Sequence, residues 1–90
     1  MPFEFDPNKS ASNKDKHGID FDAAQALWLD DGKIEILARD QSEPRRLAIG
    51  RVDGKLWTAI FTMRGDAVRL ISVRRSREAE AMRYDENNGG

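Results

Sequence analysis

Residues 55–75 read KLWTAIFTMRGDAVRLISVRR, and this stretch decides what kind of sheet the chain can form. Apolar residues alternate with others along residues 55–63 and again along residues 67–74, which is the period of β-strands. Arg64-Gly65-Asp66 lies between the two segments and marks a tight turn. The two segments are therefore predicted to pair as an antiparallel hairpin.

The same signals continue toward the N-terminus. Asp53-Gly54 is a strong two-residue hairpin signal, so a strand at residues 45–51 should join the meander. Pro44 fits the start of that strand, where a missing N–H is tolerated. A further segment of period two adds the fourth strand, and the predicted antiparallel sheet comprises residues 33–38, 45–51, 55–63 and 67–74.

Strict alternation assigns side chains to the two faces of this sheet. In residues 55–63, Trp57 and Phe61 share one face and Ile60 lies on the other, which indicates a central strand covered on both sides. In residues 67–74, alternation puts Arg74 with Leu70 and Ser72, and it puts Arg75 with Arg69, Ile71 and Val73.

Capping residues predict helices before and after the strands in the sequence. Asp6-Pro7 begins a helix that runs to about His17, where Gly18 supplies the left-handed end. Asp20 caps a second helix over residues 21–29, and a third starts at Ser76 and extends past Tyr84. The predicted fold is α+β, with two N-terminal helices, a four-stranded antiparallel sheet and a C-terminal helix. It forms one domain over residues 1–86, with a frayed tail at 87–90.

Composition excludes several classes of protein. The absence of cysteine excludes disulfides and thiolate chemistry. No segment approaches the roughly 20 apolar residues that span a bilayer, and the N-terminus lacks a signal-peptide pattern, so we expect a cytoplasmic protein that does not contact a membrane. There is also no glycine-rich phosphate loop, paired-histidine motif, nucleophile elbow or carboxylate cluster, which argues against metal or cofactor chemistry.

Charge is unevenly distributed although the net charge is only −1. Residues 1–31 hold seven acidic residues against three lysines, whereas residues 63–77 hold five arginines against Asp66 alone. Because charges are screened beyond about 8–10 Å, the basic segment can attract phosphates locally. The alternative is a solvated, charged strand edge.

Polar side chains of the first predicted helix form a stripe. Lys9, Asn13, Lys16 and His17 fall at i, i+4, i+7 and i+8, on one side of the helix. Such a stripe is either a solvated face or a site, and His17 is the side chain best suited to proton transfer at neutral pH.

Residues of the last predicted strand and the last predicted helix could line a groove on one face of the sheet. Arg74 or Arg75 should point into it, unless both form ion pairs, for example with Glu78 or Glu80. Tyr84 lies one turn after Glu80 and either presents its ring and hydroxyl to the groove or is a core tyrosine with one hydrogen bond.

The ordered set of motifs resembles the BrnT family of toxins of type II toxin-antitoxin systems. The resemblance rests on Phe5-Asp6-Pro7-Asn8-Lys9, Asn13, Lys16-His17-Gly18-Ile19, Phe21, Ala24, Trp28-Leu29-Asp30, Arg46-Leu47-Ala48-Ile49-Gly50, Arg69-Leu70-Ile71-Ser72-Val73-Arg74-Arg75, Glu80 and Tyr84. It implies a RelE-like fold and a ribonuclease that inhibits translation. It also implies a hetero-oligomer with a BrnA-like, ribbon-helix-helix antitoxin, through which the complex binds operator DNA.

Metal-free RNA cleavage needs a base for the 2′-OH, cations for the charge that develops at phosphorus and an acid for the leaving oxygen. The predicted catalytic residues are Lys16, His17, Arg64, Arg74, Arg75 and Tyr84. Lys9, Asn13 and Arg69 are predicted to bind RNA. The alternative is a non-catalytic module that binds the antitoxin or nucleic acid and acts as a co-repressor.

Overall fold

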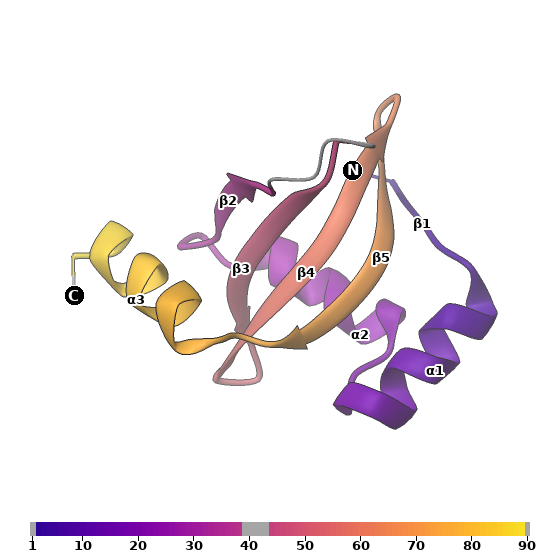
Figure 1. Ribbon diagram of the computed structural model, residues 1–90, viewed down its shortest axis with the longest axis horizontal. Coiled ribbons are helices and arrows are strands. Elements are labelled where there is room, and N and C mark those ends of the chain that lie inside the picture. Colours follow the sequence, from indigo (N-terminus) through magenta and orange to yellow (C-terminus); the bar gives the residue numbers. More distant parts are fainter. Residues whose placement is uncertain (1, 39–43, 90) are drawn as a thin grey trace.

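The computed structural model describes residues 2–38 and 44–89 and has an α+β fold, as predicted (Figure 1). Its elements are β1 (Phe3–Glu4), α1 (Pro7–His17), α2 (Phe21–Ala24), the 3-10 helix η1 (Gln25–Leu29), β2 (Ile34–Leu37), β3 (Arg46–Val52), β4 (Lys55–Arg64), β5 (Ala67–Arg75) and α3 (Glu78–Asn87). Over these residues the strands form one five-stranded sheet in the order β1-β5-β4-β3-β2.

The prediction of a purely antiparallel, four-stranded sheet was wrong at one edge. β2 to β5 pair antiparallel, but β1 adds a further strand that runs parallel to β5, with Phe3 opposite Val68. The Phe3 ring packs edge-on against Trp28, with ring centroids 5.1 Å apart. This long-range contact fixes a strand that is too short to show a period of its own.

The N-terminal helices begin where their capping residues predict. The Asp6 carboxylate accepts a hydrogen bond from the Asn8 N–H at 2.8 Å, and Gly18 ends α1 with a φ of 85°. Asp20 caps α2 through the Ala23 N–H at 2.8 Å. The predicted single helix over residues 21–29 is wrong in its second half, because the chain tightens into η1 after Ala24.

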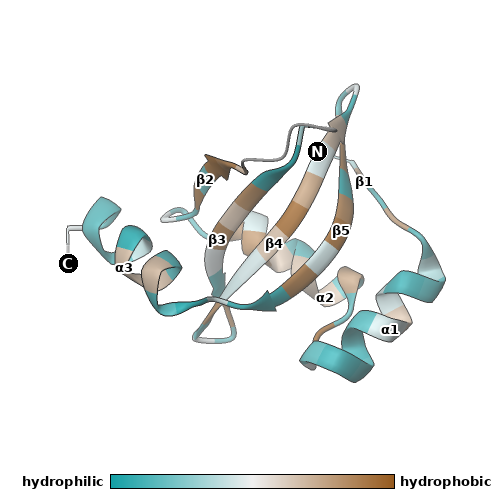
Figure 2. Ribbon diagram, viewed as in Figure 1, coloured by the Kyte–Doolittle hydropathy of each residue, from teal (hydrophilic) through white to brown (hydrophobic). Residues whose placement is uncertain are grey.

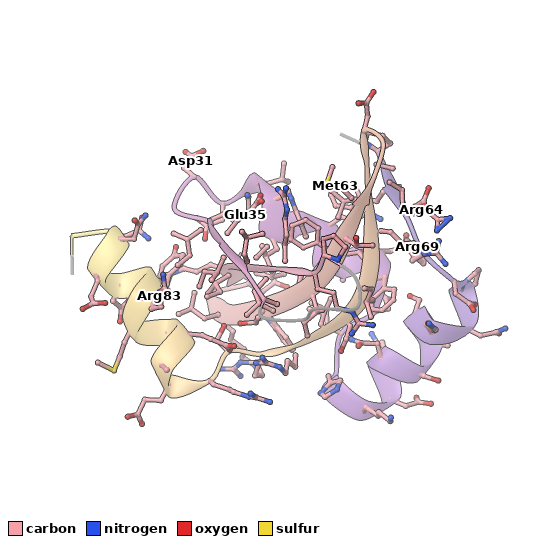
Figure 3. All side chains as sticks on the ribbon, turned by 45° about the horizontal axis from the view of Figure 1, so that its top comes forward. Asp31, Glu35, Met63, Arg64, Arg69 and Arg83 are labelled. Atoms are coloured by element: carbon pink, nitrogen blue, oxygen red, sulfur yellow. The ribbon has the colours of Figure 1, made fainter. Side chains whose placement is uncertain are left out.

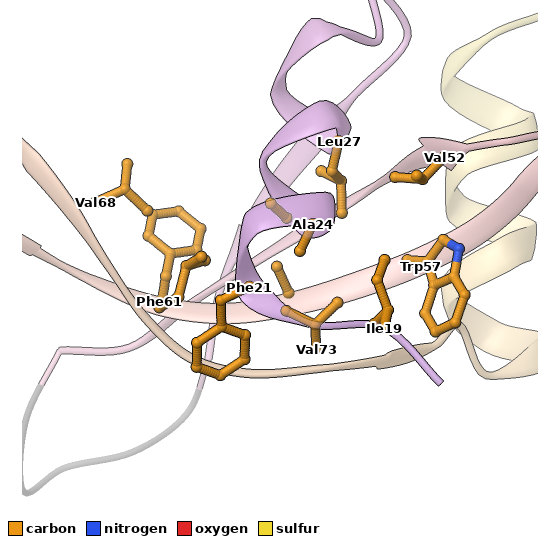
Figure 4. Close-up of a cluster of buried hydrophobic side chains, with 12 residues drawn as sticks. Ile19, Phe21, Ala24, Leu27, Val52, Trp57, Phe61, Val68 and Val73 are labelled. Carbon is orange, nitrogen blue, oxygen red and sulfur yellow. The ribbon is translucent and has the colours of Figure 1, made fainter. Parts of the chain in front are cut away.

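The main core lies between α2, η1 and one face of the sheet (Figure 4). Phe21 and Leu27 are completely buried there, against Phe61 and Val73 among others. Gly50 lets η1 approach closely, because a Cβ at this position would lie 3.0 Å from Leu27 Cδ2 and 3.2 Å from the Leu27 carbonyl oxygen.

α1 is a polar helix held by polar contacts (Figure 2). Its buried residues are Ser10 and Asn13. The Ser10 hydroxyl accepts a hydrogen bond from the Phe21 N–H at 2.9 Å, and the Asn13 amide bonds to the backbone of Val73 on β5. These two contacts fix the helix beside the sheet without a broad apolar face.

A β-bulge in β5 overturns the alternation predicted for this strand. Ile60 pairs with Ser72 and Phe61 with Leu70, so Ile71 is an extra residue. Leu70 and Val73 therefore both enter the core. Arg69, opposite Thr62, and Arg74, opposite Thr58, lie together on the other face of the sheet, whereas the prediction had separated them.

α3 begins at Glu78, two residues after the predicted start at Ser76. Ser76 instead extends the strand pairing, since its N–H donates to the Leu56 carbonyl at 3.1 Å and its hydroxyl bonds to Thr58 Oγ1 at 2.8 Å. Within residues 2–38 and 44–89, no helix has the length and apolar character needed to cross a membrane.

Candidate active site

A small hollow lies between α1 and the middle of β5. We call it the histidine hollow, and its volume is about 190 Å³. Its lining residues are Lys9, Ser12, Asn13, Lys16, His17, Ile71 and Ser72. The predicted stripe of α1 is therefore confirmed as one surface, and β5 supplies its opposite wall.

Asn13 lies in this hollow, but its amide is engaged within the protein. Its Nδ2 donates to the carbonyl oxygens of Ile19 and Val73, both at 2.8 Å, and its Oδ1 accepts from the Val73 N–H at 3.0 Å. The Asn13 amide thus makes the same two hydrogen bonds with the Val73 backbone that a residue of a neighbouring strand would make. Both N–H groups of Asn13 are used, so this side chain positions α1 and has no donor left for RNA.

A second, more basic hollow adjoins the first. We call it the arginine hollow; its volume is about 480 Å³, and it shares Lys9 and Ile71 with the histidine hollow. Its lining residues are Lys9, Arg45, Thr62, Arg64, Arg69 and Ile71. Figure 3 shows Arg64 and Arg69 close together, at the opposite end of the molecule from Arg83 on α3.

Glu4 of β1 forms ion pairs with Arg64 and Arg69 of this hollow. Its Oε1 lies 3.5 Å from Arg64 Nε and 3.3 Å from Arg69 Nη1. The side chains of Glu4, Arg64 and Arg69 are 40%, 59% and 36% exposed, so water reaches the whole group. Both distances exceed the about 2.7–2.9 Å of strong charge-assisted hydrogen bonds.

Arg74 binds a carboxylate on α3 and does not line either hollow. Its two terminal nitrogens contact Glu80 at 2.7 Å (Nη1 to Oε1) and 2.8 Å (Nη2 to Oε2). Thr58 Oγ1 and the Arg77 N–H also donate to Glu80. The hydrogen bonds from Arg74 lower the pKa of the Glu80 carboxyl to about 2, against the opposing effect of burial. The same pairing raises the pKa of Arg74.

Tyr84 fastens the other end of α3. Its hydroxyl donates to Asp30 Oδ2 at 2.8 Å, and the Arg51 guanidinium lies 5.4 Å from its ring centroid. Burial, followed by the hydrogen bond to Asp30, raises the pKa of the Tyr84 hydroxyl. This buried tyrosine with an engaged hydroxyl matches the core alternative of the sequence analysis.

Arg75 lies on the opposite face of the sheet from Arg74, as alternation predicted. Its guanidinium sits 5.5 Å from the Trp57 ring centroid, and its Nε donates to the Leu56 carbonyl at 3.3 Å. The structure therefore brings Lys9, Lys16 and His17 together, joins Arg64 and Arg69 to them through Lys9, and engages Arg74, Arg75 and Tyr84 in other contacts.

Sequence reasoning did not select Arg45, Thr62 or Ser72, although all three line a hollow. Thr62 was within reach, because the turn at Arg64-Gly65-Asp66 sets the register that places it opposite Arg69. Among the residues that the structure describes, no three histidine or carboxylate side chains are grouped so that they could hold a metal ion.

The site and fold define a small α+β domain with a histidine and several cations along one edge of its sheet. The sequence model of a family described as the ribonuclease toxin, BrnT, of type II toxin-antitoxin systems matches residues 5–80. The chain belongs to this family, as the resemblance predicted. No curated protein gives a significant match. The matched residues include both hollows and the Arg74–Glu80 pair, and they end before Tyr84.

Proposed function

We propose that the chain is a metal-independent endoribonuclease that cleaves RNA at the histidine hollow and thereby inhibits translation. Its membership of a ribonuclease toxin family supports the activity. The observation that carries the location is that Lys9, Lys16 and His17 line one hollow. A histidine with two ammonium groups supplies both proton transfer and stabilisation of charge at a phosphate.

In the proposed reaction the nucleophile comes from the RNA itself. His17 removes the proton from a 2′-OH, and the 2′-oxygen attacks the adjacent phosphorus. Lys16 stabilises the negative charge that develops on the phosphoryl oxygens, and Lys9, which both hollows share, binds the RNA backbone. The bond to the 5′-oxygen breaks, and that oxygen takes a proton from a protonated group of the hollow. The products are a 2′,3′-cyclic phosphate and a 5′-hydroxyl.

The regulation that we propose follows from the type II family, in which an antitoxin partner neutralises the toxin. A ribbon-helix-helix antitoxin of the BrnA type would cover the two basic hollows with an acidic or helical segment. The complex would bind operator DNA through the antitoxin, and the free toxin would act in the cytoplasm.

The test is cleavage of single-stranded RNA by the purified chain in EDTA, with identification of the new ends. A single 2′-deoxy substitution at the cut position should abolish that cut, because it removes the nucleophile. His17→Ala and Lys16→Ala should reduce cleavage by about 10²-fold or more. Lys14→Ala is the matched control, because it removes an ammonium group of α1 that does not line the histidine hollow.

Two results would reject this mechanism. Cleavage of the 2′-deoxy substrate at the normal rate would show that another nucleophile attacks. A folded chain that leaves RNA intact but tightens binding of its antitoxin to operator DNA would instead support the co-repressor alternative.

A further inference from the structure

The arginine hollow has more positive charge than binding of one scissile phosphate explains. Lys9, Arg45, Arg64 and Arg69 reach it from four separate segments of the chain. Lys9 also lines the histidine hollow, so the two hollows form one continuous surface. Convergence of guanidinium groups suits an oxyanion with several acceptor oxygens, such as a phosphodiester.

The length of α1 separates the two ends of this surface. Lys9 and His17 are eight residues apart, which is about 12 Å along a helix axis at 1.5 Å per residue. A phosphate held beside His17 therefore lies away from the end of the surface that Arg64 and Arg69 form, because these arginines line only the arginine hollow and His17 lines only the histidine hollow. A second phosphate of the same strand can contact Arg64 and Arg69.

Glu4 pairs with two arginines of the arginine hollow, although it does not itself line the hollow. Its carboxylate lies between Arg64 and Arg69 at 3.5 and 3.3 Å, where a phosphate oxygen would otherwise be placed. These are long, exposed ion pairs, and such pairs contribute little to stability. Glu4 is thus an exchangeable anion that keeps the arginines oriented and competes with phosphate.

We infer that the arginine hollow is a second phosphate-binding site, which holds the RNA backbone on one side of the cleaved bond, and that Glu4 competes with RNA for it. The inference rests on the proposed function for the position of the cleaved bond. It predicts that the toxin prefers RNA that extends beyond the cleaved dinucleotide, since a dinucleotide has no flanking phosphate.

The experiment compares kcat/KM for a dinucleoside monophosphate and for a single-stranded RNA that contains the same step. Arg64→Ala and Arg69→Ala should each lower cleavage of the longer RNA by about tenfold, the value of one charge-assisted hydrogen bond, and should leave the dinucleotide unchanged. Glu4→Gln should raise cleavage of the longer RNA by up to about fivefold. Arg83→Ala, which removes a distant arginine of α3, should change neither (Figure 3).

A binding arm separates this inference from the proposed reaction. A plot of the logarithm of the RNA-binding constant against the logarithm of salt concentration has a negative slope. Its magnitude should become smaller by about 0.7 for each phosphate of single-stranded RNA that a variant no longer binds. The probe is the longer RNA with a single 2′-deoxy substitution at the cut position, which the protein should bind without cutting. If the wild-type chain does not cut the unsubstituted RNA, that RNA is the probe. In that second case the proposed ribonuclease function fails, while the salt slopes of the Arg64 and Arg69 variants still test the hollow.

Three results would overturn the inference while the proposed reaction stands. Equal losses on the dinucleotide and the longer RNA would place the arginines at the scissile phosphate. Unchanged salt slopes in Arg64→Ala and Arg69→Ala would show that no flanking phosphate binds there. Weaker RNA binding by a folded Glu4→Gln variant would show that Glu4 supports RNA binding instead of competing with it.

Discussion

Arg74→Ala should destabilise the fold because Arg74 holds α3 against the sheet. The variant removes the two guanidinium contacts to Glu80 and leaves the Thr58 hydroxyl and the Arg77 N–H as donors to its carboxylate. Hydrogen bonds to charged groups contribute about 1.5–3 kcal/mol, and the Glu80 side chain is only 13% exposed. We therefore expect the free energy of unfolding to fall by about 2–3 kcal/mol at pH 7, measured by urea denaturation.

The pH dependence of this loss follows from the lowered pKa of Glu80. A carboxyl with a folded pKa of about 2, against an ordinary value of 4.5, contributes stability above pH 4.5 and loses it as the pH falls toward 2. The difference between wild type and Arg74→Ala should thus shrink by about half at pH 3. Glu80→Gln in the Arg74→Ala background should recover about 1 kcal/mol by removing an unpaired charge.

Arg75→Ala is the matched control for this prediction, because it removes the neighbouring arginine and a cation–π contact of about 0.5–1 kcal/mol. The reasoning is refuted if the free energy of unfolding of Arg74→Ala lies within about 0.5 kcal/mol of the wild-type value and the variant nevertheless binds RNA more weakly. Arg74 would then be a phosphate ligand, as the sequence had predicted.

Three further substitutions test other contacts. Tyr84→Phe should lower the free energy of unfolding by about 1–2 kcal/mol and leave cleavage per folded molecule unchanged; a selective loss of cleavage would place the hydroxyl in catalysis. Asn13→Asp should be strongly destabilised at pH 7, because a carboxylate oxygen would face the Ile19 and Val73 carbonyls, and should regain stability as the pH falls and the acid protonates; the opposite pH trend would contradict this. Gly50→Ala should lower the melting temperature through a loss of about 1–3 kcal/mol, since its Cβ meets the Leu27 backbone; an unchanged value would show that η1 can move away.

Local signals in the sequence predicted most of the secondary structure. Asp6, Gly18 and Asp20 mark helix ends, and Asp53-Gly54 marks a hairpin, because capping and turn geometry depend on a few adjacent residues. The parallel pairing of β1 with β5, the 3-10 turn of η1 and the bulge at Ile71 depend on contacts between distant segments. Strict alternation cannot anticipate such contacts.

Part of the candidate site could also be predicted from local spacing, and part depends on contacts between distant segments. The stripe of Lys9, Lys16 and His17 follows from helical spacing alone, and the structure confirms it as the wall of one hollow. Arg74 and Tyr84 were selected because a groove could use them, but whether a polar side chain faces a ligand or a partner depends on the position of α3. The sequence indicated Glu80 as a possible ion-pair partner of Arg74 or Arg75, but it did not decide whether these arginines form ion pairs or face a ligand.

The contacts of α3 affect how toxicity in growth assays should be interpreted. Arg74 and Tyr84 stabilise the attachment of α3, whereas Lys16 and His17 line a hollow on α1. Loss of toxicity in variants of either group is expected, because destabilisation by about 1–3 kcal/mol lowers the amount of folded protein, and loss of a catalytic group lowers the activity of the protein that folds. Only cleavage normalised to folded protein separates the two groups: it should be retained in Arg74→Ala and Tyr84→Phe and lost in His17→Ala.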